Sequence, residues 1–264
     1  MKFDLLLVAV WASAILACSS QQSASISLKG MKAENYFENP VQVELAQATA
    51  RNDIRGIDAA LAKGADANGI GREEMTPLAW AFSKQQKESF KRLLEKGANP
   101  NFQTKKVAWN NDGQSVMQFA ALSEDPDYLR LALQHGGNPN APDLLPGKTI
   151  IFTAIRNRRS ENVEILAKGG ADIDRQDKAG FTPIMAAKND TQYDIVFLLM
   201  ELGADLSKRH HLMTPDGDKK NAGQTLAESI QQLGDRSIRV LGKEKEQREW
   251  YDKVVAELRR RGLM

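Results

Sequence analysis

The sequence predicts an all-α solenoid of about five repeats with helical caps, and three observations support this fold class. First, a short motif ending in glycine recurs with spacings of 33, 39, 34 and 33 residues. The aligned glycines are Gly64, Gly97, Gly136, Gly170 and Gly203. Second, an alanine precedes each glycine by sixteen residues; these are Ala48, Ala81, Ala120, Ala154 and Ala187. Third, apolar residues between alanine and glycine recur at helical spacing, which gives each repeat one apolar helix face. A fixed period near 33 residues is typical of stacked repeats.

Each repeat is expected to contain a short helix, a turn, a longer helix that stops at the glycine, and an extended loop. Thr76-Pro77 and Thr182-Pro183 stand where the first helix begins, because threonine caps a helix and proline suits its first turn. Ser115 and Thr149 take this place in two other copies, without the proline. The closing glycines suit the left-handed conformation that ends a helix.

The pattern resembles the ankyrin repeat over about residues 41–207. The segment DKAGFTP (177–183) matches the loop that leads into the first helix of the family's repeat, and TPL (76–78) matches it again. The resemblance implies an ankyrin-repeat domain over 33–223, followed by a C-terminal helical cap over 224–264. We expect a final helix from Lys243 to Leu263, on which Trp250, Val254 and Leu258 form one stripe that covers the last repeat.

The first seventeen residues, 1–17, are predicted to be a lipoprotein signal peptide. An apolar run from Leu5 to Leu16 is too short to span a bilayer about 30 Å thick and fits a secretory signal. The run ends in ILAC (15–18), which resembles a bacterial lipobox and contains the single cysteine of the chain. This resemblance implies a lipid such as palmitate on Cys18, a flexible tether over 18–32, and a periplasm-facing protein of the outer membrane. An ordinary signal peptide with a chance cysteine is the alternative.

Composition excludes several classes of function. The 36 Lys and Arg nearly balance the 34 Asp and Glu, so the net charge gives no electrostatic argument for a nucleic-acid partner, which usually needs a clustered basic surface. One cysteine allows no disulfide within the chain, and three histidines without a further ligand give no basis for a metal site. No nucleophile elbow, phosphate-binding loop or zinc-protease motif is present in the sequence. We therefore expect no enzyme activity, no cofactor and no metal.

The ankyrin resemblance implies that partner contacts come from the loop before each first helix and from the end of that helix. Mapped onto this sequence, these positions and the inserted loop around Trp109 give twelve candidates. They are Arg72, Met75, Lys84, Trp109, Asn111, Gln114, Leu122, Lys148, Arg156, Asn157, Phe181 and Asn189. Met75, Leu122 and Phe181 are expected to be exposed apolar anchors. The alternative for each is a side chain folded back onto its own repeat, most evenly balanced for Trp109 and Met75.

Ankyrin arrays bind proteins through an extended concave surface. The arrangement of a lipid anchor, an inserted loop and a Trp-Tyr terminal helix resembles ankyrin lipoproteins that act as immunity proteins against type VI secretion effectors, especially phospholipases. The partner implied is therefore a secreted toxin or lipase effector met at the membrane. A periplasmic adaptor or chaperone scaffold for a resident envelope protein is the alternative, and a lipoprotein enzyme is a third. Replacing Phe181 and Arg156 together is expected to weaken binding while the array stays folded.

Overall fold

The structure is a computed structural model that describes residues 32–104, 115–143, 145, 147–210, 212–213, 219–220, 223–233 and 244–264. The predictions for Cys18, Trp109, Asn111 and Gln114 fall outside the described residues. The described chain divides into two compact units, one that ends at Asn138 and one that begins at Pro139. Each unit is described by itself.

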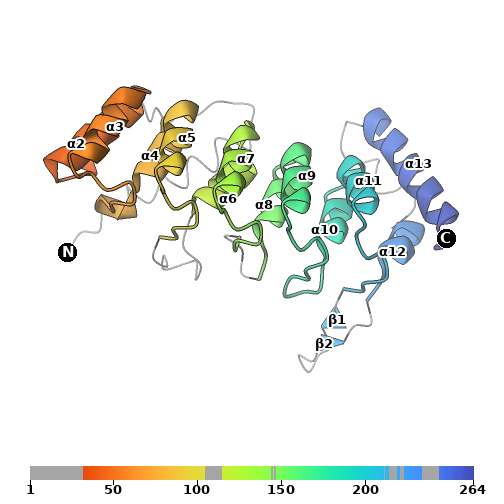
Figure 1. The fold of residues 1–264 in the computed structure, drawn as a ribbon. Helices are drawn as coiled ribbons and strands as arrows, with labels where there is room; N and C mark the ends of the chain where they lie inside the picture. The colour runs from red at the N-terminus through yellow and green to blue at the C-terminus, as the bar shows by residue number, and fades with distance from the viewer. Residues whose placement is uncertain are drawn as a thin grey trace. The chain divides into compact units, whose positions relative to one another are not determined.

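The first unit is a stack of helix pairs. Its elements are η2 (Ala33–Asn35), α2 (Pro40–Ala50), α3 (Ile54–Ala62), η3 (Arg72–Glu74), α4 (Pro77–Ser83), α5 (Lys87–Glu95), α6 (Val116–Leu122) and α7 (Asp127–Gln134). Consecutive helices form the pairs α2–α3, α4–α5 and α6–α7, and each pair packs against the next (Figure 1). The predicted short first helix and longer second helix are confirmed in the pairs α4–α5 and α6–α7. In the first pair the order is reversed, because α2 has 11 residues and α3 has 9.

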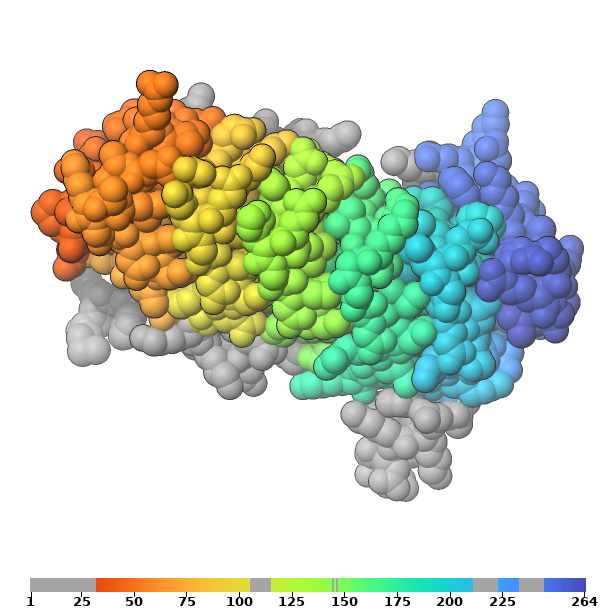
Figure 2. Space-filling view, viewed as in Figure 1, coloured from red at the N-terminus to blue at the C-terminus, as the bar shows by residue number. Residues whose placement is uncertain are grey.

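The second unit continues the same arrangement. Its elements are α8 (Ile150–Arg156), α9 (Ser160–Lys168), α10 (Pro183–Asn189), α11 (Tyr193–Glu201), β1 (Leu212–Met213), β2 (Lys219–Lys220), α12 (Leu226–Leu233) and α13 (Glu244–Arg260). The short strands β1 and β2 pair in antiparallel fashion. Helices α9 and α11 pack side by side, as the green and cyan surfaces in Figure 2 show, and α13 packs against α11. The all-α fold class is therefore confirmed.

The repeated alanines and glycines have the structural roles that their spacing suggests. All five alanines are buried, with at most 2% of their surface exposed, so the helices approach closely where a larger side chain would not fit the packed interior. All five glycines have positive φ angles between 85° and 99°. This left-handed conformation strains other residues and ends the second helix of each repeat.

The helix starts lie where the sequence predicts, but only some of the expected caps form. The Thr76 hydroxyl accepts a hydrogen bond from the amide of Ala79, and Ser115 forms a capping box with Gln118. Thr149 and Thr182 occupy the N-cap positions of α8 and α10, yet neither side chain caps its helix. Within the described part of the chain both hydroxyls are buried without a hydrogen-bond partner. The predicted cap hydrogen bonds are therefore wrong in these two copies.

Aromatic side chains close the N-terminal end of the first unit. Tyr36 and Phe37 pack against Trp80, with ring centroids 5.5 and 6.2 Å apart respectively. The Trp80 indole donates a hydrogen bond of 2.9 Å to the carbonyl of Ala46. An aromatic cluster thus covers the end of the first helix pair.

The last helix, α13, lies within the range predicted for it. Val254 and Leu258 are fully buried, and Tyr251 packs edge-on against Tyr193 at 5.2 Å. Trp250 is half-buried and packs against Phe197 at 5.6 Å. The expected apolar stripe therefore covers α11.

One asparagine side chain per repeat joins the closing turns of neighbouring repeats in the first unit. Asn68 Nδ2 donates to the carbonyl of Gly97 (2.9 Å), and Asn68 Oδ1 accepts from the amide of Asn99 (2.7 Å). Both groups of the amide are used, so the side chain fixes the spacing of the two turns. The next repeat has the same two hydrogen bonds, formed by Asn101 with Gly136 and Asn138.

The second unit contains one further asparagine bridge and one incomplete bridge. Asn140 donates to the carbonyl of Gly170 (3.1 Å) and accepts from the amide of Asp172 (2.8 Å). At the next equivalent position Asp174 accepts from the amide of Asp205 (2.7 Å). An ionised carboxylate has no N–H to donate, so the second half of the bridge is lost at this repeat.

Exchanging the two side-chain types tests this bridge. Asn140→Asp removes a donor and places a carboxylate oxygen near the Gly170 carbonyl, so we expect the free energy of unfolding to fall by about 1 kcal/mol. Asp174→Asn supplies the missing donor, and we expect a gain of about 0.5–1 kcal/mol. Urea denaturation at pH 7 measures both changes. Shifts in the same direction for the two variants would contradict the account.

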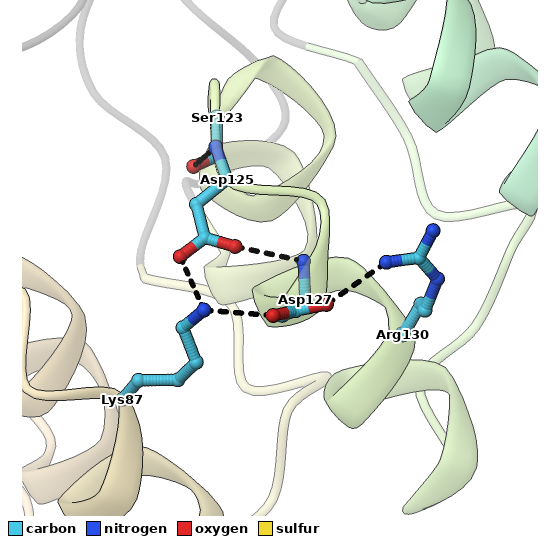
Figure 3. A network of polar contacts seen from close by, with 5 residues as sticks. All are labelled: Lys87, Ser123, Asp125, Asp127 and Arg130. Carbon is cyan, nitrogen blue, oxygen red and sulfur yellow. Dashed lines mark hydrogen bonds and ion pairs between the residues drawn. The ribbon is translucent and has the colours of Figure 1, made fainter.

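A network of charged side chains joins α5 to α7 (Figure 3). The Lys87 ammonium lies 2.7 Å from carboxylate oxygens of both Asp125 and Asp127. Asp127 also pairs with Arg130 at 2.9 Å. The hydrogen bond from Lys87 is the main cause that lowers the pKa of Asp127, and the two acceptors raise the pKa of Lys87. The network therefore favours the charged forms of both groups.

The lowered pKa of Asp127 gives a pH dependence of stability. A carboxyl group with a lower pKa in the folded chain stabilises the fold above its unfolded pKa, and this contribution is lost as pH falls through the folded value. Lys87→Met should therefore lower the melting temperature at pH 7, and the difference from wild type should shrink below pH 3.8, the ordinary value for this group. Melts from pH 7 down to pH 2, with the exposed Lys168→Met as control, test this. A pH-independent difference would refute it.

Candidate protein-binding surface

Two of the predicted apolar anchors are buried, and the expectation that they are exposed is wrong. Met75 is 1% exposed and belongs to the cluster around Trp80. The backbone turns here, with hydrogen bonds from the Gly71 amide to the Met75 carbonyl and from the Met75 amide to the Arg72 carbonyl. The side chain packs in a cluster with Tyr36 and Phe37 as well as with Trp80. Leu122 is 6% exposed, because it ends a helix, α6, in which every residue is buried.

The two predicted cations of the first unit have different surroundings. Arg72 is exposed and forms an ion pair of 2.8 Å with Glu38. Lys84 is half-buried, with its ammonium 4.3 Å from the ring centre of Trp80, and burial lowers its pKa. Lys84 also borders a groove of about 880 Å³ together with Lys32 and Arg51. The structure thus places Lys84, but not Arg72, at this groove.

In the second unit, a buried carboxylate positions Arg156. The Asp143 side chain is fully buried, and it accepts a hydrogen bond from the amide of Leu145 (3.0 Å). The Arg156 guanidinium, 40% exposed, pairs with it at 3.2 Å. The Lys148 carbonyl accepts a hydrogen bond from the amide of Asp143. Asp143 therefore contacts both predicted cations of this repeat, Lys148 through its backbone and Arg156 through its side chain. Asn157 is tied back to its own helix by a 2.8 Å hydrogen bond to the Thr153 carbonyl.

The loop before α10 connects this region to the next repeat. Lys148 Nζ lies 3.5 Å from an Asp177 carboxylate oxygen and 5.3 Å from the ring centre of Phe152. Asp177 also accepts hydrogen bonds from the amides of Ala179 and Phe181. One aspartate therefore both closes the loop and fixes its position against Lys148.

Phe181 and Asn189 lie at a single small cavity of about 160 Å³. The Phe181 ring is partly exposed and stacks on His210 with centroids 4.9 Å apart and an interplanar angle of 17°. Asn189 is exposed at the end of α10. Of the predicted partner contacts, these two come closest to the expected combination of an apolar anchor and a polar rim. We call Phe181, Lys188, Asn189 and His210 the Phe181 surface.

Sequence reasoning missed three residues of this region. His210 follows Asp177 by 33 residues, so the repeat period marks it as part of the next loop. Asp143 precedes Asp177 by 34 residues, so the same period marks it as a loop residue but does not indicate its burial. Lys188 gave no such signal, because a charged residue at a helix end is ordinarily solvated. Their burial depends on tertiary packing.

Two further kinds of feature are absent from the residues that the structure describes. No group of three or more His, Cys, Asp or Glu side chains in this part of the chain could hold a metal ion. No helix among the described elements is long and apolar enough to cross a membrane.

The buried Asp143 makes Arg156 unsuitable for a test of binding alone. Arg156→Ala leaves a buried carboxylate without its partner, so we expect a loss of about 1–3 kcal/mol in the free energy of unfolding. A double variant of Arg156 and Phe181 is therefore expected to be less stable than wild type, so weaker binding by it would not by itself identify the contact surface. Arg72→Ala, at an exposed pair, should cost no more than about 1 kcal/mol. Chemical denaturation compares the two variants, and equal losses would contradict the role of burial.

Comparisons with known proteins agree with this architecture. A family model described as ankyrin repeats (3 copies) matches residues 45–143 and 117–210. Protein PhlB of Serratia liquefaciens is 34% identical over 185 residues, which cover 70% of this chain and 75% of that protein. Cyclin-dependent kinase inhibitor 2A of Monodelphis domestica is 30% identical over 131 residues, covering 48% of this chain and 71% of the inhibitor. Ankyrin repeats indicate a protein-binding scaffold, and the chain belongs to the ankyrin-repeat family.

Proposed function

We propose that this chain is an envelope lipoprotein that binds a secreted antibacterial effector of the phospholipase class, delivered by type VI secretion, and neutralises it. The observation that carries the proposal is the single cysteine, Cys18, at the end of an apolar run ahead of an ankyrin array. A lipid on Cys18 would hold the array at the membrane surface that a phospholipase must reach. Tethering raises the local concentration of a binding module without any new contact.

The family supports inhibition through binding rather than catalysis. Three relatives are named as inhibitors of cyclin-dependent kinases, and they match 45–48% of this chain. Arrays of this kind can therefore act on an enzyme as inhibitors. For this chain we propose that the array covers either the active site of the effector or the surface with which the effector meets lipid.

The Phe181 surface is the proposed contact region. Phe181 is held by the stack on His210 and by the amide hydrogen bond to Asp177. Ordered side chains lose less conformational entropy when a partner binds. A partly exposed aromatic ring beside the exposed Asn189 suits an anchor within a polar rim.

Protection and binding can be tested separately. Cells that direct a type VI phospholipase effector to their own periplasm should stop growing, and coproduction of the full chain should restore growth. Cys18→Ala removes the proposed anchor, so we expect protection to fall while affinity for the purified effector is kept. Recovery of only a resident envelope protein with the tagged chain, and no protection, would instead favour the adaptor function.

The contact region has its own test. Phe181→Ala combined with Asn189→Ala should weaken effector binding at least tenfold, or about 1.4 kcal/mol, with a melting temperature close to that of wild type. Lys168→Ala, on the exposed side of α9, is the matched control and should bind like wild type. Unchanged affinity of the double variant would refute this choice of surface.

A further inference from the structure

Lys188 is a buried cation near the end of α10. Only 4% of the residue is exposed, and burial lowers the pKa of its ammonium. Its Nζ donates a hydrogen bond of 2.5 Å to the Ser229 hydroxyl of α12. Among the residues that the structure describes, no carboxylate lies within ion-pair distance of it. Lysine is almost never fully buried unless it is paired.

The cavity beside Lys188 has the size and lining of a side-chain pocket. It measures about 160 Å³, and the stacked Phe181 and His210 belong to its wall. Polar groups and apolar surface both line it; the remaining lining residues are Met185, Asn189, Gln224, Thr225, Leu226 and Ser229. Asn189 is exposed and Gln224 is partly exposed, so the cavity borders solvent. It is too small for a folded segment and can admit one side chain.

The acidic residue of α12, Glu228, is already paired with another cation. Glu228 pairs with Arg209 at 2.5 Å and accepts a hydrogen bond from the amide of Thr225. It is not part of the cavity lining. The carboxylate of Glu228 is therefore neutralised by Arg209 and not by Lys188. Lys188 is left with a neutral partner, the hydroxyl of Ser229.

We propose that this cavity is a carboxylate subsite that receives an aspartate or glutamate side chain of the protein partner. A carboxylate that enters would form a charge-assisted hydrogen bond with an ammonium that is already desolvated. Such bonds are stronger than neutral ones and strongest where water is excluded. The inference rests on the proposed function for the existence of a partner, but it does not depend on which effector is bound.

The probe is N-acetylglutamic acid α-amide, whose only charge is the side-chain carboxylate, and its neutral match is N-acetylglutamine amide. Ligand-observed NMR titration of the full chain should show saturable binding of the acidic probe and at least tenfold weaker binding of the neutral one. Lys188→Met should abolish the binding. Lys168→Met removes an exposed lysine of the same unit and should leave binding unchanged.

The melting temperatures of the same variants show whether a loss of binding is caused by unfolding. Because methionine fills a similar volume without a charge, Lys188→Met should melt at or above the wild-type temperature, so lost binding cannot reflect unfolding. Equal binding of the two probes, no saturable binding, or an equal loss in Lys168→Met would overturn the proposal.

The closing experiment separates this proposal from the proposed function. Lys188→Met should also protect cells less well than wild type against the phospholipase effector. If it loses the probe but protects fully, the partner does not use the subsite and the inference is overturned, while the proposed function stands. If the wild-type chain gives no protection, the proposed function fails, and the probe titration still decides whether the carboxylate site exists.

Discussion

The hydrogen bonds that asparagine side chains make between closing turns are the constraint on which the rest of each unit depends. A single helix pair cannot bury its own apolar face, so a repeat is stable only against its neighbours. Asn68 and Asn140 each fix this contact by donating to a glycine carbonyl and accepting from an amide two residues beyond that glycine. The buried alanines set how closely the helices approach, and the bridges set the register between turns.

The same constraint positions the candidate surface. Asp174, which forms half of a bridge to Asp205, is followed three residues later by the loop that Asp177 closes. That loop contacts Lys148 on one side and, through Phe181, His210 on the other. The loops of the second unit therefore form a connected series of polar and aromatic contacts. Binding residues are commonly carried by loops that a rigid scaffold positions, which agrees with the contact region proposed above.

The sequence predicts the repeats well because their determinants are local. A left-handed glycine, a small alanine and a helical apolar spacing act within one repeat, and the structure confirms each of them at every copy. Exposure of side chains near the loops depends instead on how the backbone turns in three dimensions. Met75 is directed inward by a turn that its position before Thr76 does not reveal.

The candidate surface was predicted only in part for the same reason. Phe181 and Asn189 follow from the repeat alignment, but their neighbour Lys188 belongs to a sequence that suggests an ordinary cationic helix end. Its burial depends on α12, which lies about forty residues further along the chain. Charge placed in a packed interior is unfavourable for stability, and such departures from local rules are expected at functional sites.

The most direct test of the central claim is hydrogen–deuterium exchange of the full chain with and without the proposed partner, a phospholipase effector. The account predicts that bound effector slows exchange in residues 177–190 and 223–230, which carry the Phe181 surface and the wall of the cavity. Exchange in 193–201, the second helix of the repeat that contains α10, and in 160–168, the second helix of the repeat before it, should be unchanged. Slower exchange only in those second helices would contradict the account, since it would place the partner on the opposite side of the helix pairs.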